Sequence, residues 1–262
     1  MKMFLQAGSR KIPLEKVLWM GIVNATPDSF SDGGRSVEEN VTHALELLKS
    51  GAEILDIGGE STRPGATPVP QEIECGRILP VLRGIRQACE AALPVFSIDT
   101  YHPETARAAI AEGATLINDV SGVQNAAMLR LLQETDVAVC FMHGFNCPQC
   151  DGDITETVFQ FLAERRDTLL AAGIARERLI ADVGLGFGKS AEENWELVRN
   201  IQRFHELGVP LLVGHSRKRF LGTVATHTVS QELIAKGVQI LRVHSLPDNR
   251  SANPDTNLPQ NG

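Results

Sequence analysis

Short apolar runs rich in Val, Ile and Leu alternate with amphipathic segments along nearly the whole of this 262-residue chain. The apolar runs predict strands near residues 17–24, 52–57, 94–99, 115–119, 136–142, 178–183, 210–214 and 238–243. The segments between them place apolar residues three or four positions apart and predict helices near 37–49, 71–91, 103–112, 125–134, 153–172, 191–207 and 230–236. Strict alternation without a break long enough for a linker predicts one α/β domain, a single (β/α)8 TIM barrel over residues 1–245.

Both ends of the chain depart from this regular pattern. Residues 3–14 predict a small hairpin that covers the barrel floor. From Arg219 to Leu241 only 23 positions remain for a loop, the seventh helix and the eighth strand, so a shortened seventh helix is expected. Residues 246–262 are rich in proline and asparagine and predict a disordered tail, which leaves the barrel without its eighth outer helix.

Nearly every predicted strand ends in a polar cluster. In such a barrel the carboxyl ends of the strands meet at one mouth, where the chemistry of these folds takes place. A buried strand seldom ends by chance in a carboxylate or amide so many times over, so we expect a binding site at this mouth. The clusters are Asn24, Asp56, Asp99, Asn118–Asp119, Met142–His143, Asp182, Ser216–Arg217–Lys218 and Arg242–His244.

The net charge limits the classes of partner, and the cysteine usage indicates the redox compartment. The formal net charge of -7 and the pI near 5.5 argue against a nucleic-acid partner and against an anionic membrane surface. An anionic substrate must therefore meet cations that are clustered locally. The N-terminal stretch has the pattern of neither a signal peptide nor a membrane span, and five cysteines without small-scaffold spacing fit a reducing cytoplasm.

Seven motifs occur in the same order as in one enzyme family. The first two are Asn24-Ala-Thr-Pro-Asp-Ser-Phe-Ser-Asp-Gly-Gly34 and Asp56-Ile-Gly-Gly-Glu-Ser-Thr-Arg-Pro-Gly-Ala66. The others are Ser97-Ile-Asp-Thr100, Ile117-Asn-Asp119, Asp182 with Gly184-Leu-Gly-Phe-Gly-Lys189, Gly214-His-Ser-Arg-Lys218 and Arg242-Val-His244. Over about residues 15–245 the chain resembles the dihydropteroate synthases. The resemblance implies a transferase of folate synthesis, which condenses 6-hydroxymethyl-7,8-dihydropterin diphosphate with p-aminobenzoate and releases 7,8-dihydropteroate and diphosphate.

The resemblance also implies that the pterin lies deep in the mouth. Asp99, Asn118 and Asp182 would hydrogen-bond its aminopyrimidine edge, where a carboxylate can accept two parallel N–H bonds. Lys218 would reach the pterin carbonyl and a ring nitrogen, and Met142 would pack on the ring face. The alternative for the polar residues is an internal hydrogen-bond network that supports the barrel, and for Met142 plain core packing is the favoured interpretation.

The leaving diphosphate would meet an anion pocket made by Arg63, Arg242 and His244. Asn24 would ligate Mg²⁺ through its amide oxygen, together with diphosphate oxygens and water. In the implied substitution at the pterin methylene carbon, Mg²⁺ and the arginines would stabilise the diphosphate while Asp99 favours the pterin cation. The catalytic residues implied are Asp99, Lys218 and Arg63.

The p-aminobenzoate would lie between loops, with its carboxylate on Ser216, its ring against Phe187 and Pro64, and Thr62 lining the slot. Sulfonamides mimic this substrate in the family, so we expect them to bind here. Asp28 and Asp32 could assist the metal through water, but a solvated turn is the alternative and is favoured for Asp28.

Three departures from the family pattern bear on the dimer and on local structure. Val183 replaces a usual proline, and His215 occupies a position where a small or sulfur-bearing residue is expected. Family members usually form a homodimer through their last helices, so the shortened C-terminal region predicts reduced stability or altered dimer packing with the chemistry intact. Cys147-Pro-Gln-Cys150 could be a redox pair or half a zinc site, but a loop with two reduced thiols is favoured.

Two other functions stay open. A methyltransferase of the methyltetrahydrofolate–corrinoid type shares a barrel and an Asp/Asn pterin floor, although it has no need of residues 62–65 or 216–218. A non-catalytic relative that binds pterin or partners without turnover is the other alternative.

Overall fold

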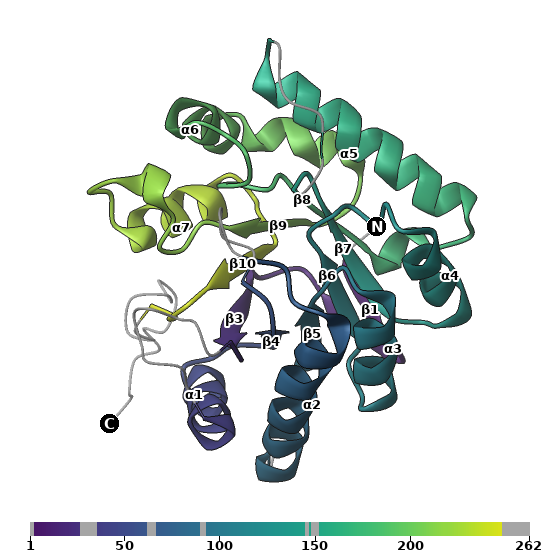
Figure 1. The fold of residues 1–262 in the computed structure, drawn as a ribbon. Coiled ribbons are helices and arrows are strands. Elements are labelled where there is room, and N and C mark those ends of the chain that lie inside the picture. Colours follow the sequence, from purple (N-terminus) through teal and green to yellow (C-terminus); the bar gives the residue numbers. More distant parts are fainter. Residues whose placement is uncertain are drawn as a thin grey trace, which may run out of the picture.

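The computed structural model describes residues 3–26, 36–61, 67–89, 93–144, 147 and 152–247. Eight parallel strands close into a barrel in chain order, and the last pairs with the first. They are β3 (Leu18–Asn24), β4 (Ile54–Gly58), β5 (Val95–Asp99), β6 (Leu116–Asp119), β7 (Ala138–Met142), β8 (Leu179–Asp182), β9 (Leu211–Gly214) and β10 (Ile240–Val243). The predicted (β/α)8 barrel is confirmed, and Figure 1 shows the helices arranged around the outside of the strands.

The outer helices follow the strands one by one. They are α1 (Val37–Lys49), α2 (Gln71–Ala88), α3 (Pro103–Ala111), α4 (Ala126–Glu134), α5 (Ile154–Ala171), α6 (Ala191–Arg199) and α7 (Thr226–Ala235). Short 3-10 helices cover Arg176–Arg178, Ile201–Leu207 and Arg219–Leu221. Helices α1 and α6 each begin with a capping box, Ser36 with Glu39 and Ser190 with Glu193, which satisfies two N–H groups at each start. No helix among the described residues is long and apolar enough to cross a membrane.

Most helices lie within about three residues of their predicted bounds, and two differ more. The helix predicted over 191–207 ends at Arg199 and continues as a 3-10 helix after Asn200, whose side-chain amide donates to Thr155 Oγ1 at 3.1 Å. The seventh helix begins at Thr226, four residues earlier than predicted. After β10 the described residues, which end at 247, contain no further helix, and most of the predicted tail over 246–262 lies outside them.

The barrel has an apolar floor that the N-terminal hairpin closes. Strands β1 (Phe4–Ala7) and β2 (Arg10–Pro13) pair antiparallel, as predicted for residues 3–14. Leu5 and Ala7 are fully buried, and they pack with the inward side chains of the lower barrel. Those side chains are Leu18, Met20, Ile54, Val95, Leu116, Ala138, Cys140, Ile180, Leu212 and Ile240. A second, larger core lies between the strands and the helices, so each strand is buried on both faces.

Candidate functional site

The inward face of the strands changes from apolar to polar on the way to the mouth. Side chains alternate between the two faces of a strand, so residues two positions apart point the same way. Ile54, Val95 and Leu116 lie inward in the floor core. Two residues later the same face carries Asp56, Ser97 and Asn118, all buried. The polar residues at the strand ends therefore line the upper interior of the barrel, where they can meet a ligand.

Asp56 connects the polar layer. Its Oδ1 accepts from Ser97 Oγ at 2.5 Å, and its Oδ2 accepts from Asn118 Nδ2 at 3.2 Å and from Arg242 Nε at 2.6 Å. Each of these partners is a donor, which suits an ionised carboxylate that can only accept. Asp56 thus fixes the guanidinium of the last strand against the second, across 186 positions of sequence.

Asp99 shares the same guanidinium. Arg242 Nη2 donates to Asp99 Oδ2 at 2.7 Å. Burial opposes the charge on Arg242, but the carboxylates of Asp56 and Asp99 outweigh it and raise the arginine pKa. Burial raises the pKa of Asp99 to about 7, against the opposing effect of Arg242. Among the described residues the other oxygen, Asp99 Oδ1, is buried without a hydrogen-bond partner, and so is Asn118 Oδ1 on the neighbouring strand.

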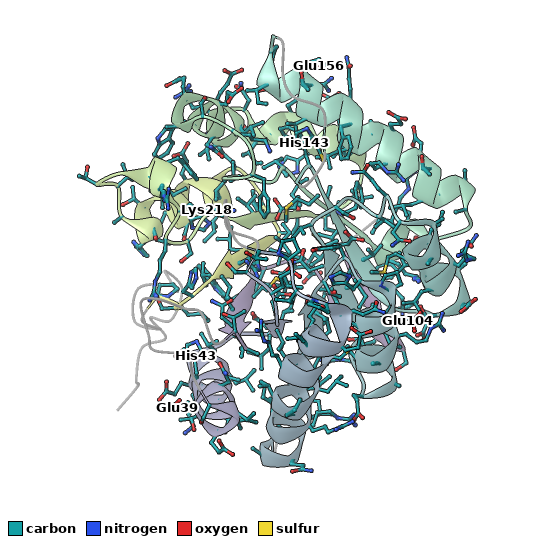
Figure 2. All side chains as sticks on the ribbon, viewed as in Figure 1. Glu39, His43, Glu104, His143, Glu156 and Lys218 are labelled. Carbon is teal, nitrogen blue, oxygen red and sulfur yellow. The ribbon has the colours of Figure 1, made fainter. Side chains whose placement is uncertain are left out.

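Lys218 and Asp182 form the opposite side of this layer. Lys218 follows β9 and is labelled in Figure 2, and its Nζ donates to the carbonyl oxygen of Leu185. Burial lowers the pKa of Lys218 to about 8, although Asp182 opposes the shift. Burial also raises the pKa of Asp182, whose Oδ1 accepts from Gly184 N at 2.8 Å. Burial of these opposite charges makes their mutual attraction stronger than it would be in water.

The loop after β8 is tied down on several sides. The Lys218 ammonium lies 5.0 Å from the centre of the Phe187 ring. Lys189 Nζ donates to the carbonyl oxygens of Gly184, His143 and Phe187, at 2.8, 3.0 and 3.2 Å. Burial lowers the pKa of Lys189 to about 8. Asn194 at the start of α6 accepts from Gly186 N at 2.6 Å.

The segments after β9 and β10 bring Ser216 and His244 together. Ser216 Oγ accepts from His244 N at 3.3 Å and lies 3.1 Å from His244 Nδ1. Between Ser216 and Lys218, Arg217 has a φ of 57°, a left-handed conformation that is costly for a residue with a side chain. This strained turn directly follows the buried strand end, as is common at functional sites.

Asn24 and Gly58 lie beside Asp99 in the top layer. The register pairs Asn24 with Gly58 and Gly58 with Asp99, so the glycine separates the amide from the carboxylate. A Cβ at Gly58 would lie 3.4 Å from Asp99 Cβ. Among the described residues no group of three or more His, Cys, Asp or Glu side chains is placed to hold a metal. Among the described residues at this position, the amide oxygen of Asn24 is a hard ligand of the kind that Mg²⁺ prefers.

The structure places most of the predicted residues at one mouth. Asp99 and Arg242 are in contact, Asn118 is one strand from Asp99, and Met142 is paired in register with Asp182. Asp119, by contrast, belongs to the outward face of β6, where it accepts from Ser121 N and Oγ at 2.7 and 2.6 Å, and burial raises its pKa to about 6. The predicted positions outside the described residues are Thr62, Arg63, Pro64, Asp28, Asp32 and Cys150.

The sequence places two site residues without giving either a contact. Asp56 lies near a strand end and Lys189 ends a motif. Strand periodicity alone predicts that Asp56 faces the same way as the floor residue Ile54. His215 is fully buried, with Nε2 2.8 Å from Ser230 Oγ, and burial lowers its pKa to about 4, so it is neutral at pH 7. The small side chain of Ser230, on α7, therefore leaves room for the imidazole.

Comparison with known proteins gives one consistent result. A family model described as pterin binding enzyme matches residues 20–244. A dihydropteroate synthase of Streptococcus pyogenes is 38% identical over 246 residues, which cover 88% of this chain and 91% of the relative. Among solved structures, a Xanthomonas albilineans dihydropteroate synthase with 4-aminobenzoic acid is 42% identical, with a TM-score of 0.85 and 93% of each chain covered. A Yersinia pestis dihydropteroate synthase in a sulfonamide complex is 34% identical, with a TM-score of 0.85 over 93% of this chain and 94% of that one.

Proposed function

We propose a reaction for this chain from the premise that it belongs to the pterin-binding enzymes and, within them, to the dihydropteroate synthases, transferases of folate synthesis. The reaction is the condensation of 6-hydroxymethyl-7,8-dihydropterin diphosphate with p-aminobenzoate. The observation that carries the proposal is a pair of buried acceptors, Asp99 Oδ1 and Asn118 Oδ1, which have no partner within the described part of the chain and lie near the guanidinium of Arg242. A buried acceptor without a donor costs about 1–3 kcal/mol, so this pair favours a ligand that presents N–H groups.

The aminopyrimidine edge of a pterin presents such groups. Asp99 Oδ1 and Asn118 Oδ1 would accept from it, while Asp99 Oδ2 keeps its bond to Arg242. Asp182 completes the edge, and Lys218 turns from the Leu185 carbonyl to the pterin carbonyl and ring nitrogen. Met142, which is buried at the end of β7, contacts the ring face. One N–H of the Asn118 amide is engaged by Asp56, and its Oδ1 is the atom that we assign to the pterin as an acceptor.

The substitution breaks the bond between the pterin methylene carbon and the diphosphate oxygen. The bonding electrons leave with the diphosphate, and the amine of p-aminobenzoate attacks the carbon and then loses a proton. Arg242, with N–H groups to spare after its two carboxylate bonds, and His244 stabilise the growing negative charge, and we assign Arg63 to the same pocket. Asp99, held beside the ring, stabilises the positive charge on the pterin. Ser216 and Phe187 receive the carboxylate and the ring of p-aminobenzoate, and Thr62 and Pro64 line the slot.

Mg²⁺ fits this arrangement through the amide oxygen of Asn24. When bound with the diphosphate, the ion would neutralise part of the leaving group's charge. Asn24→Ala should raise the Mg²⁺ concentration for half-maximal activity about tenfold, and calorimetry should show a matching loss of Mg²⁺ affinity with the pterin diphosphate bound. An unchanged requirement would remove Asn24 from the metal site.

The function is tested by product formation from the two substrates with Mg²⁺. We expect the wild type to form dihydropteroate. Asp99→Asn should lose about a hundredfold in kcat/KM for the pterin diphosphate, because the buried ion pair between Asp99 and Arg242 is lost. Asp119→Asn is the matched control, because it neutralises a buried carboxylate on the outward face of the next strand. Pterin binding without turnover in the wild type would overturn the activity and favour a non-catalytic relative.

Three further properties follow from the same assignment. Sulfonamides should compete with p-aminobenzoate, and inhibition that p-aminobenzoate does not relieve would contradict this. Cys75, Cys89 and Cys140 are free thiols, which supports a reducing cytoplasm as the place of the reaction. We keep the homodimer as a proposal, for which light scattering of the purified protein is the test.

A further inference from the structure

The loop over residues 184–188, which we call the Phe187 loop, needs support from outside itself. Gly184, Gly186 and Gly188 have φ values of 68°, 78° and 61°, and glycine loses more conformational freedom on ordering than any other residue. A Cβ at Gly184 would collide with the carbonyl oxygen of His143, so the loop passes directly against the end of β7. Within the loop, Phe187 N donates to the Gly184 carbonyl at 3.2 Å, which closes a turn but does not attach that turn to the rest of the barrel.

The ammonium group of Lys189 supplies that support. Its three N–H donors meet three backbone carbonyls, two within the Phe187 loop (Gly184 and Phe187) and one beyond β7 (His143, labelled in Figure 2). Burying an ammonium group is costly unless its donors are satisfied, and here all of them are. These bonds therefore tie the loop after β8 to the segment after β7.

Three other side chains hold the same loop. Asp182 accepts from Gly184 N at 2.8 Å, at the first residue of the loop. Asn194 and Lys218 hold its middle, and they differ in what a substrate would do to them. Asn194 accepts from Gly186 N and lies on α6, away from the ligand. Lys218 donates to the Leu185 carbonyl, but in the proposed reaction it turns to the pterin. When the pterin binds, the Phe187 loop therefore loses its bond from Lys218. Lys189 and Asn194, together with the Asp182 carboxylate at the first residue of the loop, then keep it in place for the second substrate.

We propose that Lys189 is a positioning residue for p-aminobenzoate, because its ammonium group holds the Phe187 loop against the end of β7 while Lys218 engages the pterin. The inference rests on the proposed function, in which Phe187 forms the wall of the p-aminobenzoate slot. Lys189 itself touches neither substrate.

The test compares Lys189→Met with Lys236→Met. Lys236 is a matched control, since its Nζ also makes three bonds, to the carbonyls of Val198 and Arg199 at 3.0 Å and to Glu232 Oε1 at 2.6 Å, on helices α6 and α7. We expect Lys189→Met to raise the KM for p-aminobenzoate about tenfold or more, with the KM for the pterin diphosphate changed less than about threefold. Lys236→Met should change neither the KM for p-aminobenzoate nor the KM for the pterin diphosphate. Equal rises in both KM values for Lys189→Met would overturn the proposal.

Hydrogen exchange gives a readout that does not need turnover. Amides in peptides covering residues 183–190 should exchange about tenfold faster in Lys189→Met than in the wild type or Lys236→Met. An inactive wild type would refute the proposed function, while this exchange still decides whether Lys189 fixes the loop. Lys189→Arg keeps the charge but not the geometry for three carbonyls, so it should fold and show an intermediate KM and exchange rate. Wild-type exchange in both Lys189 variants would overturn the proposal.

Discussion

Asp99→Asn should stabilise the fold at alkaline pH, relative to the wild type, although it removes a proposed substrate contact. Burial raises the pKa of the Asp99 carboxyl to about 7, whereas an unfolded chain holds an aspartate near 3.9. Between these values the folded protein keeps a proton that the unfolded chain has released. The free energy of unfolding therefore falls as pH rises from about 4 to 7, and it stays lower above this range.

The size of the effect follows from the two pKa values. At roughly 1.4 kcal/mol per pK unit, the ionisation of Asp99 costs the wild type about 2–3 kcal/mol between pH 5 and pH 8. Asparagine does not titrate, so the free energy of unfolding of Asp99→Asn should fall by about 2–3 kcal/mol less than that of the wild type over the same pH interval. In a chain of this size the difference corresponds to about 5–10 °C in Tm.

Urea unfolding of both proteins at pH 5 and pH 8 measures this difference, and every other titrating group cancels in the comparison to first order. Asp119→Asn serves as the control, because the Asp119 pKa of about 6 gives a loss of only about 1.4 kcal/mol over the same interval, roughly half of that expected for Asp99. Parallel pH dependences for the wild type and Asp99→Asn would refute the reasoning. They would mean that Arg242 keeps Asp99 ionised already at pH 5, despite the burial of the carboxyl.

Three other predictions concern the same mouth. The kcat/KM for the pterin diphosphate should be bell-shaped, rising near pH 7 as Asp99 ionises and falling near pH 8 as Lys218 loses its proton, and Lys218→Arg should move the alkaline limb upward in a rate–pH profile. His215→Gln should lose about 2–3 kcal/mol less stability than the wild type between pH 6.5 and pH 4 in urea unfolding, because the buried imidazole with its pKa of about 4 stays neutral while the unfolded chain binds a proton. Gly58→Ala should weaken pterin diphosphate binding about tenfold in calorimetry with little change in Tm, because the methyl group fills the space between Asn24 and Asp99 at an ordinary contact distance.

The fold was predictable because each strand is buried on both faces, and such strands have nearly continuous apolar sequences. The break after Arg199 was not, since the 3-10 helix over Ile201–Leu207 keeps the apolar spacing of the preceding helix while changing its hydrogen bonds. The early start of α7 at Thr226 was also missed, because Thr226, His227 and Thr228 lack the helical periodicity of the residues that follow.

The site was predictable as a set of residues but not as a set of bonds. Strand alternation places Asn118 inward and Asp119 outward, a distinction that a cluster read from sequence does not draw. The pairing of Arg242 with Asp56 joins positions 186 residues apart and depends on barrel closure. The three carbonyl bonds of Lys189 were likewise invisible, because backbone acceptors leave no trace in residue identities.

The two bonds that hold Arg242 in the absence of substrate also affect how the site would bind the pterin and release the diphosphate. In the proposed reaction Asp99 gives one oxygen to the guanidinium and the other to the pterin, so pterin binding would not have to break the ion pair. The diphosphate would then meet a cation whose direction Asp56 and Asp99 have already set, so little reorganisation would be needed as charge builds on the leaving group. The same two carboxylates offset the arginine's charge and occupy part of its donor set, so they weaken its hold on free diphosphate. A net acidic barrel can thus stabilise a departing anion and still release it.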